Sequence, residues 1–325
     1  MRIGLITSAP GHPLLAATTA LLVPGHRVVH LDPGTAVPDT ADEEPLADVY
    51  LLKARTPRAL ELAAALERRG APVVNSSSAT ALCQDRTAMA DLALRAGLPF
   101  APTRTFPALA DLASGPPLTG PVVVKSRHSR RQDLVARVDG EARLRELAAA
   151  APGEPVVVQD FVPNSGDDHK LWVVGEQVFA ALRRSELAPG GRGPTRPLPD
   201  AGLPAGWAAL ARRVGEVFAL DVYGVDVLDT GGGAPVIVDV NAFPGIRGQA
   251  GAPEALAALA LSRSGGDERR ERRERRERRE RRERRERRER PEGPEGRGGR
   301  ERGEGQGGRE GREGREEGRG AHATR

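Results

Sequence analysis

Two carboxylates and an amide stand in strand-like runs where valine or isoleucine would be expected: Asp226, Asp239 and Asn241. The two runs are joined by three glycines at 231–233, which predicts a hairpin. Asp239 and Asn241 are two residues apart, so their side chains face the same side of a strand. A buried carboxylate is costly unless it is paired, and Mg²⁺ takes oxygen ligands of this type. The hairpin therefore predicts a magnesium site; the alternative is a hairpin whose acids face solvent.

Lysine is rare in this chain, with three residues in all, and two of them stand in strand-like runs of the same region. Lys125 ends the run VVVK beside a polar turn, where an ammonium group could hold a phosphate. Lys170 begins a predicted hairpin over 169–185, and Arg184 lies near its other end. We expect Arg183 to point the opposite way from Arg184.

The first hundred residues alternate apolar runs with helical patterns, which predicts a small parallel α/β unit. Its loop after the first run, SAPGHP, has one glycine, so no dinucleotide fingerprint is present there. Ser76 to Ser78 can cap a single helix predicted over 79–96. Strands are predicted at 2–7, 26–32, 47–53 and 72–75, with helices at 14–22 and 57–69.

The second region is predicted to be mainly paired strands with a few helices. A segment with many prolines and glycines at 188–205 is predicted to be a loop. Strands are predicted at 122–125, 134–138, 156–162 and within 169–185, followed by the hairpin described above, with helices at 140–150, 207–219 and 253–261.

The positive charge of the chain belongs to its C-terminal part. Fifteen arginines face nine acids between 267 and 290, and eight face eight between 291 and 325, so residues 1–266 carry −2 of the net +4. The folded part therefore offers no global signal for nucleic acid. Residues 268–290 repeat Glu-Arg-Arg and could form a charged helix, whereas 291–325 are expected to be disordered. A weak electrostatic tether and an extension without a specific role are both compatible with this tail.

A single cysteine, Cys83, excludes an internal disulfide and fits a reducing compartment. The start of the chain, MRIGLIT, does not have the pattern of a signal peptide. No run approaches the roughly 20 apolar residues of a membrane span. We expect a soluble, cytoplasmic protein with no membrane partner.

The order of these segments resembles the ATP-grasp superfamily. The segments are VVVK, VVVQDFV, the D-x-K-L-W-V-V-G run, RRS, GVD and D-V-N-A-F-P-G. They are most similar to RimK-type carboxylate–amine ligases and to inositol trisphosphate 5/6-kinases. The resemblance implies an α/β and α+β fold, with a parallel pre-ATP-grasp domain at 1–104, an ATP-grasp domain at 105–261 and a low-complexity tail at 262–325.

The resemblance also implies cofactors and roles for the site residues. Mg²⁺, or Mn²⁺ in its place, would be held by Asp226, Asp239 and Asn241 and would bridge the phosphates of ATP. Lys170 and Arg184 would be catalytic and would stabilise charge on the transferring phosphoryl group. Nucleotide binding is implied for Arg86, Lys125, Ser185 and the adenine hinge of Gln159, Asp160, Phe161 and Val162, and substrate binding for Lys53, His128, Lys170 and Gly245.

Three features depart from the pattern of these families. Asp85 is followed by Arg86 where many relatives have lysine. The polar turn SRHSRRQD stands in place of a glycine-rich lid, and SELAPGGRGP in place of the R-x-N-x-x-x-G-G loop of RimK-type enzymes. The missing loop weakens the ligase interpretation, and His128 lies near a lid histidine of the inositol kinases.

The sequence thus predicts a Mg-ATP-dependent enzyme that transfers a phosphoryl group to an oxygen nucleophile. The first hypothesis is an ADP-forming ligase that makes an acylphosphate from a small-molecule carboxylate and joins it to an amine. The alternative is a kinase that acts on an inositol phosphate or another small molecule, and the second alternative is a catalytically silent nucleotide-binding module. No nucleic-acid partner is expected, and the sequence does not predict an oligomeric state.

Overall fold

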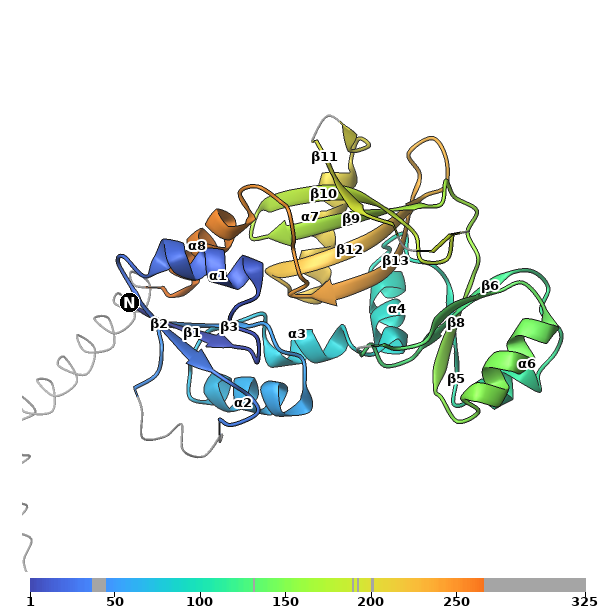
Figure 1. The fold of residues 1–325 in the computed structure, drawn as a ribbon, viewed down its shortest axis with the longest axis horizontal. Coiled ribbons are helices and arrows are strands. Elements are labelled where there is room, and N and C mark those ends of the chain that lie inside the picture. The colour runs from blue at the N-terminus through green and yellow to red at the C-terminus, as the bar shows by residue number, and fades with distance from the viewer. Residues whose placement is uncertain (37–44, 131, 189, 192, 200–201, 266–325) are drawn as a thin grey trace, which may run out of the picture. The chain divides into compact units, whose positions relative to one another are not determined.

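Three sheets arranged along the chain make up the part of the computed structural model that is described here, which is residues 1–36, 45–130, 132–188, 190–191, 193–199 and 202–265 (Figure 1). The first sheet is parallel and has the order β2-β1-β3-β4. Its strands are β1 (Arg2–Ile6), β2 (Arg27–Leu31), β3 (Val49–Leu52) and β4 (Val73–Val74), and its first two helices are α1 (Pro13–Leu22) and α2 (Pro57–Arg68). The predicted N-terminal parallel α/β unit is confirmed.

Strands β1 and β3 are neighbours in this sheet, but their connections leave in opposite directions. The chain passes from β1 through α1 to β2 on one side, and from β3 through α2 to β4 on the other. A crevice forms outside the carboxyl ends of two such strands, and open α/β sheets bind ligands there.

The predicted single helix over 79–96 is two helices, α3 (Ser77–Leu82) and α4 (Arg86–Arg95). Asp85 causes the break because its carboxylate accepts hydrogen bonds from the peptide N–H groups of Thr87 and Ala88, at 2.9 and 3.3 Å. An aspartate with this geometry caps a new helix. The prediction of one continuous helix was wrong, and the break places Arg86 in the first turn of α4.

The second sheet is antiparallel, with the order β5-β8-β6-β7. Leucines of its two helices pack on alternate valines of β6 and β8 and form a separate small core. The strands are β5 (Thr103–Phe106), β6 (Val122–Ser126), β7 (Val135–Val138) and β8 (Val156–Asp160), and the helices are α5 (Leu109–Ala113) and α6 (Glu141–Ala150).

The third sheet, with the order β11-β10-β9-β12-β13, is also antiparallel. Its strand β11 lies within the segment that the sequence predicted as a loop. Trp207 and Phe218 of the helix α7 (Trp207–Phe218) are buried in the core of this sheet. The strands are β9 (Asp167–Val174), β10 (Gln177–Arg184), β11 (Thr195–Leu198), β12 (Val222–Asp229) and β13 (Pro235–Ala242).

Packing links segments that are distant in the chain. The last described helix, α8 (Ala252–Arg263), packs beside α1 over the first sheet (Figure 1). Residues of α3 and α4 share a core with α7 and the third sheet. The domain boundaries at 104 and 261 stay predictions, and the predicted charged helix and disordered end of the tail lie outside the described residues. None of the helices within the described ranges is both long and apolar enough to cross a membrane.

Candidate active site

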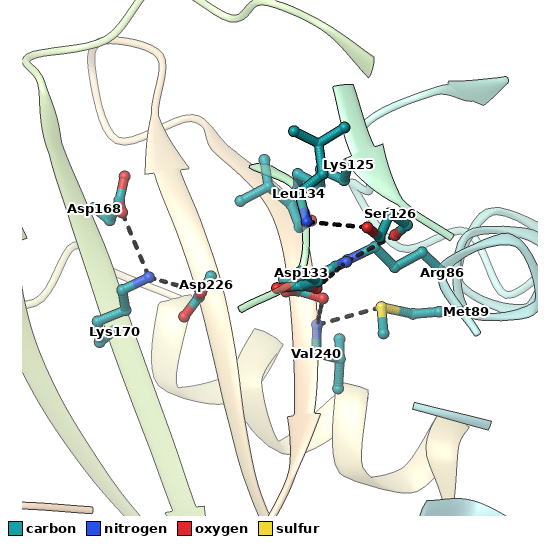
Figure 2. A network of polar contacts seen from close by, with 12 residues as sticks. Arg86, Met89, Lys125, Ser126, Asp133, Leu134, Asp168, Lys170, Asp226 and Val240 are labelled. Atoms are coloured by element: carbon teal, nitrogen blue, oxygen red, sulfur yellow. Dashed lines mark hydrogen bonds and ion pairs between the residues drawn. The ribbon is translucent and has the colours of Figure 1, made fainter. Parts of the chain in front are cut away.

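Strand register places three charged side chains in one row across the third sheet. Lys170 of β9 is directly opposite Asp226 of β12, which is opposite Asp239 of β13. Residues that face each other in antiparallel strands project to the same side of the sheet. The Nζ of Lys170 is 2.6 Å from Oδ2 of Asp226 and 3.4 Å from Oδ2 of Asp168 (Figure 2).

A β-bulge between β12 and β13 lies next to this row. Asp226 pairs with Asp239 but Val227 pairs with Ile237, so Val238 is the extra residue. Its carbonyl oxygen accepts a hydrogen bond of 2.8 Å from the Nζ of Lys125, which comes from β6 of the second sheet. Bulges often re-aim groups beside active sites, and this one links the two sheets. Burial lowers the pKa of the Lys125 ammonium, although Asp239 opposes that effect.

Arg86 is buried at the start of α4 and connects three parts of the site. Its Nη1 donates to the carbonyl oxygen of Ser126 at 2.8 Å and to Oδ2 of Asp133 at 2.6 Å (Figure 2). Its Nη2 lies 3.4 Å from Oδ2 of Asp239. Burial lowers the pKa of Arg86, but the two carboxylates outweigh burial and raise the pKa overall. The site therefore holds a permanent cation beside Asp239.

The polar turn between β6 and β7 is fastened to the junction of α3 and α4. Nη2 of Arg127 is 2.7 Å from Oδ2 of Asp85, and the N–H of Ser129 donates to the Gln84 carbonyl at 2.8 Å. The N–H of Arg86 in turn donates to the Arg127 carbonyl at 2.9 Å. His128 in the middle of this turn is exposed and is not among the described residues that line the cavity below, so its predicted contact with substrate stays a prediction.

These elements surround a cavity of about 610 Å³ between the second and third sheets. Most residues that the sequence singled out line it. They are Arg86, Lys125, Gln159, Asp160, Phe161, Val162, Lys170, Arg184, Ser185, Asp226, Asp239 and Asn241. Their individual roles stay predictions.

The expected directions of the two arginines at the end of β10 were wrong. Arg183 is opposite Asp168, so it lies on the same side of the sheet as Lys170, and its Nη2 is 3.9 Å from Oδ2 of Asp168. Arg184 is opposite Asp167 on the other side, with 4.0 Å between Nη1 and Oδ1. Both still line the cavity, because it extends past the strand end. Arg183 is therefore a site residue that the sequence reasoning set aside.

The predicted adenine hinge follows β8. The peptide N–H of Phe161 donates to the carbonyl of Pro121 at 2.9 Å, so this group is already used. The ring of Phe161 lies 3.9 Å from the guanidinium carbon of Arg137, and the amide of Gln159 donates to Thr103 at 3.1 Å. The side chains of Gln159 and Phe161 are thus engaged within the protein. An adenine base would have to hydrogen-bond to backbone groups other than the Phe161 N–H.

Lys53 and Gly245 lie together outside the residues that line this cavity. The Nζ of Lys53 donates to the carbonyl of Phe243 at 2.9 Å, two residues before Gly245. Three further basic residues accompany them, namely His12, Arg55 and Arg247. Sequence reasoning missed these three; the signal available was that His12 and Arg55 follow the first and third predicted strands of a parallel sheet.

Comparisons with known proteins indicate the fold family of this region. Residues 108–252 match the family model described as the RimK-like ATP-grasp domain. A RimK domain ATP-grasp protein of Sphaerobacter thermophilus has a similar structure, with a TM-score of 0.63, 25% identity and coverage of 80% of this chain and 100% of that one. Residues 108–252 are therefore similar to a RimK-like ATP-grasp domain.

Two further proteins that are similar to this chain are named as ligases. A probable alpha-L-glutamate ligase of Thioalkalivibrio sulfidiphilus is 29% identical over 196 residues, which are 56% of this chain and 63% of that relative's length. D-alanine–D-alanine ligase from Bacillus anthracis is 15% identical, with a TM-score of 0.62 and coverage of 81% of this chain and 97% of that one. The predicted ATP-grasp fold is confirmed.

The ATP-grasp domain implies Mg²⁺, and the donor set of this chain fits it. The Asp239 and Asp226 side chains face the cavity and are 15% and 24% exposed, while Asn241 follows on the same side of β13. Within the described ranges no three His, Cys, Asp or Glu side chains group to hold a metal. Mg²⁺ fits a smaller set, because it is usually bound by one or two carboxylates together with substrate phosphates.

Proposed function

We propose that this protein is a Mg-ATP-dependent ligase that joins a carboxylate to an amine through an acylphosphate. The observation that carries this proposal is the row of Lys170, Asp226 and Asp239, with Lys125 and Arg86 beside it at one cavity. Two carboxylates for a metal and three cations for phosphates are the parts that phosphoryl transfer needs. The ligase names of the relatives support the second half of the reaction.

In this reaction an oxygen of the acceptor carboxylate attacks the γ-phosphorus of ATP, and the bond to ADP breaks. The amine then attacks the acyl carbon of the acylphosphate, loses a proton, and displaces inorganic phosphate. Bound Mg²⁺ would supply charge neutralisation at the phosphates. In this proposal Lys170 would stabilise the transferring group, and Lys125 and Arg86 would hold the phosphates that leave with ADP.

Lys170 has two carboxylate partners, and this arrangement suits a cation that changes partners during turnover. Asp226 is 2.6 Å from its Nζ, and Asp168 is 3.4 Å away. If Asp226 held the metal, Asp168 would still balance the buried ammonium group, which would avoid an uncompensated charge.

The test measures ATP consumption by the full chain with Mg²⁺, a panel of amino acids, dicarboxylates and inositol phosphates, and hydroxylamine as an acylphosphate trap. Hydroxamate that forms only with both ATP and a carboxylate is the expected result. A stable phosphorylated polyol without hydroxamate would replace the ligase with the kinase. Bound nucleotide without turnover across the panel would favour the silent module.

A further inference from the structure

Four basic side chains meet beside the nucleotide cavity, at the carboxyl edge of the first sheet. His12 comes from the loop after β1, Lys53 and Arg55 from the loop after β3, and Arg247 from the segment after β13. We call these four residues the basic cluster. A Cβ atom on Gly245 would lie 3.1 Å from Nε2 of His12 and 3.9 Å from Nε of Arg247, so these groups crowd around one glycine.

The basic cluster has no acidic partner among the residues that the structure describes. Burial, followed by Arg55 and Arg247, lowers the pKa of Lys53 to about 8. Burial, Lys53 and Arg247 lower the pKa of His12, whose Nδ1 is buried without a hydrogen-bond partner in the described part of the chain. Like charges held together without a counter-ion cost free energy, and a bound anion would remove this cost.

The position of the basic cluster is one where α/β sheets bind ligands. Lys53 follows β3, and His12 follows β1 and immediately precedes α1. These are the two neighbouring strands whose connections leave in opposite directions. The N-terminus of α1, a helix of ten residues, adds the positive end of its dipole.

Arg55 connects the basic cluster to the nucleotide cavity, because it lines that cavity together with Asp239 and Asn241. An anion held at Lys53 and Arg247 can therefore extend a second group past Arg55 into the cavity that Asp239 and Asn241 line. The absence of a described acidic side chain in the cluster disfavours a free ammonium group there, since nothing would neutralise it.

We propose that the basic cluster is the acceptor subsite and that its ligand is a dicarboxylate without a free amine next to it. One carboxylate is held by Lys53, Arg247 and His12, and the other passes Arg55 to receive the phosphoryl group. The fate of the second carboxylate rests on the proposed ligase function, but the recognition of the first does not.

A matched pair of probes tests this proposal by isothermal titration of the full chain at pH 7. N-acetyl-L-glutamate carries two carboxylates, and N-acetyl-L-glutamine carries one on nearly the same skeleton. We expect the dicarboxylate to bind more tightly, by about tenfold or more. Equal affinity for the two probes would overturn the proposal, and so would a preference for inorganic phosphate over N-acetyl-L-glutamate.

Substitutions in the basic cluster test whether N-acetyl-L-glutamate binds there. Arg247→Gln and Lys53→Met should each weaken N-acetyl-L-glutamate by about tenfold, whereas Arg247→Lys should keep most of the affinity. Arg68→Gln, an exposed arginine near the end of α2, is the matched control and should change nothing. ATP affinity, measured in the same samples, should be unchanged in all four variants, which shows that they are folded. Unchanged dicarboxylate affinity in Arg247→Gln and Lys53→Met would contradict the assignment.

The two proposals fail separately. Preferential dicarboxylate binding that depends on Arg247 and Lys53, without hydroxamate formation, would reject the ligase and keep the subsite. Hydroxamate formation from a monocarboxylate, insensitive to both variants, would keep the ligase and reject the subsite.

Discussion

Each carboxylate of the predicted metal site already has a protein cation beside it. Asp226 faces Lys170 at 2.6 Å, and Asp239 faces Arg86 at 3.4 Å. The pairs hold the carboxylates in place on their strands. They also mean that removing one charge leaves its partner unbalanced in a half-buried site.

Asp239→Asn tests the role of this carboxylate, because the amide keeps the shape and removes the charge. We expect turnover to fall by at least about a hundredfold, while the far-ultraviolet circular dichroism spectrum is unchanged. Asp91→Asn, an exposed aspartate of α4, is the control and should retain full activity. Full activity in Asp239→Asn would remove this residue from the metal site.

The pH dependence of acceptor binding follows from Lys53, whose pKa is lowered to about 8 by burial and by Arg55 and Arg247. The ammonium is charged below pH 8 and neutral above it, so affinity for N-acetyl-L-glutamate should be highest below pH 8 and decline as the pH rises through it. The pKa of His12, another member of the basic cluster, is also lowered, by burial and by Lys53 and Arg247.

The matched variant for this prediction is Lys53→Arg. A guanidinium stays charged at these pH values, so the decline near pH 8 should disappear in titrations of the variant. The same decline in wild type and variant would assign it to a group other than Lys53.

At the scale of elements, Asp85 has two structural roles at the junction of α3 and α4. It caps α4 through the N–H groups of Thr87 and Ala88, and it pairs with Arg127 of the polar turn. Helix start and turn position are therefore fixed by the same carboxylate, and the turn carries Asp133 to Arg86.

Two substitutions separate the helix cap of Asp85 from its ion pair with Arg127. Asp85→Ala removes both and should lower the free energy of unfolding by about 1 kcal/mol, the usual value of an N-cap. Asp85→Asn keeps the cap and loses only the charge, and because the ion pair is partly exposed it should cost less than half as much. Urea unfolding measures both. Equal losses would show that the ion pair, not the cap, fixes the helix start.

The sequence was informative where chemistry depends on spacing within one strand. Asp239 with Asn241, and Lys170 with Asp168, share faces because alternate residues of a strand do. The sequence was not informative where the side on which a residue lies depends on the register between two strands. The directions of Arg183 and Arg184 depend on the pairing of β9 with β10, which residue counting in a predicted hairpin did not resolve.

Contacts between segments that are distant in the chain could not be predicted from the sequence either. Arg247 is far along the chain from His12 and Lys53, and it meets them only because α8 and the segment before it return to the first sheet. The bulge at Val238 and the helix break at Asp85 are local, but each is one among several conformations that its sequence permits.

At the scale of the whole molecule, the question is whether the charged C-terminal part takes part in nucleotide binding. Residues 1–266 carry a net −2, and the remaining residues carry +6. A cation-rich segment would raise the affinity for an anionic nucleotide only if it came within a Debye length of the site, about 8 Å at physiological salt.

A chain truncated after residue 265 keeps α8 intact and should bind ATP with the same affinity as the full chain at 0.15 M salt, measured by isothermal titration. A chain truncated after residue 261 is the contrasting variant, because it also removes Arg263, whose guanidinium pairs with Asp221. It should unfold at a lower temperature, since the end of α8 is lost from the face of the first sheet. Weaker ATP binding in the first truncation, with an unchanged melting temperature, would give the tail a part in nucleotide binding.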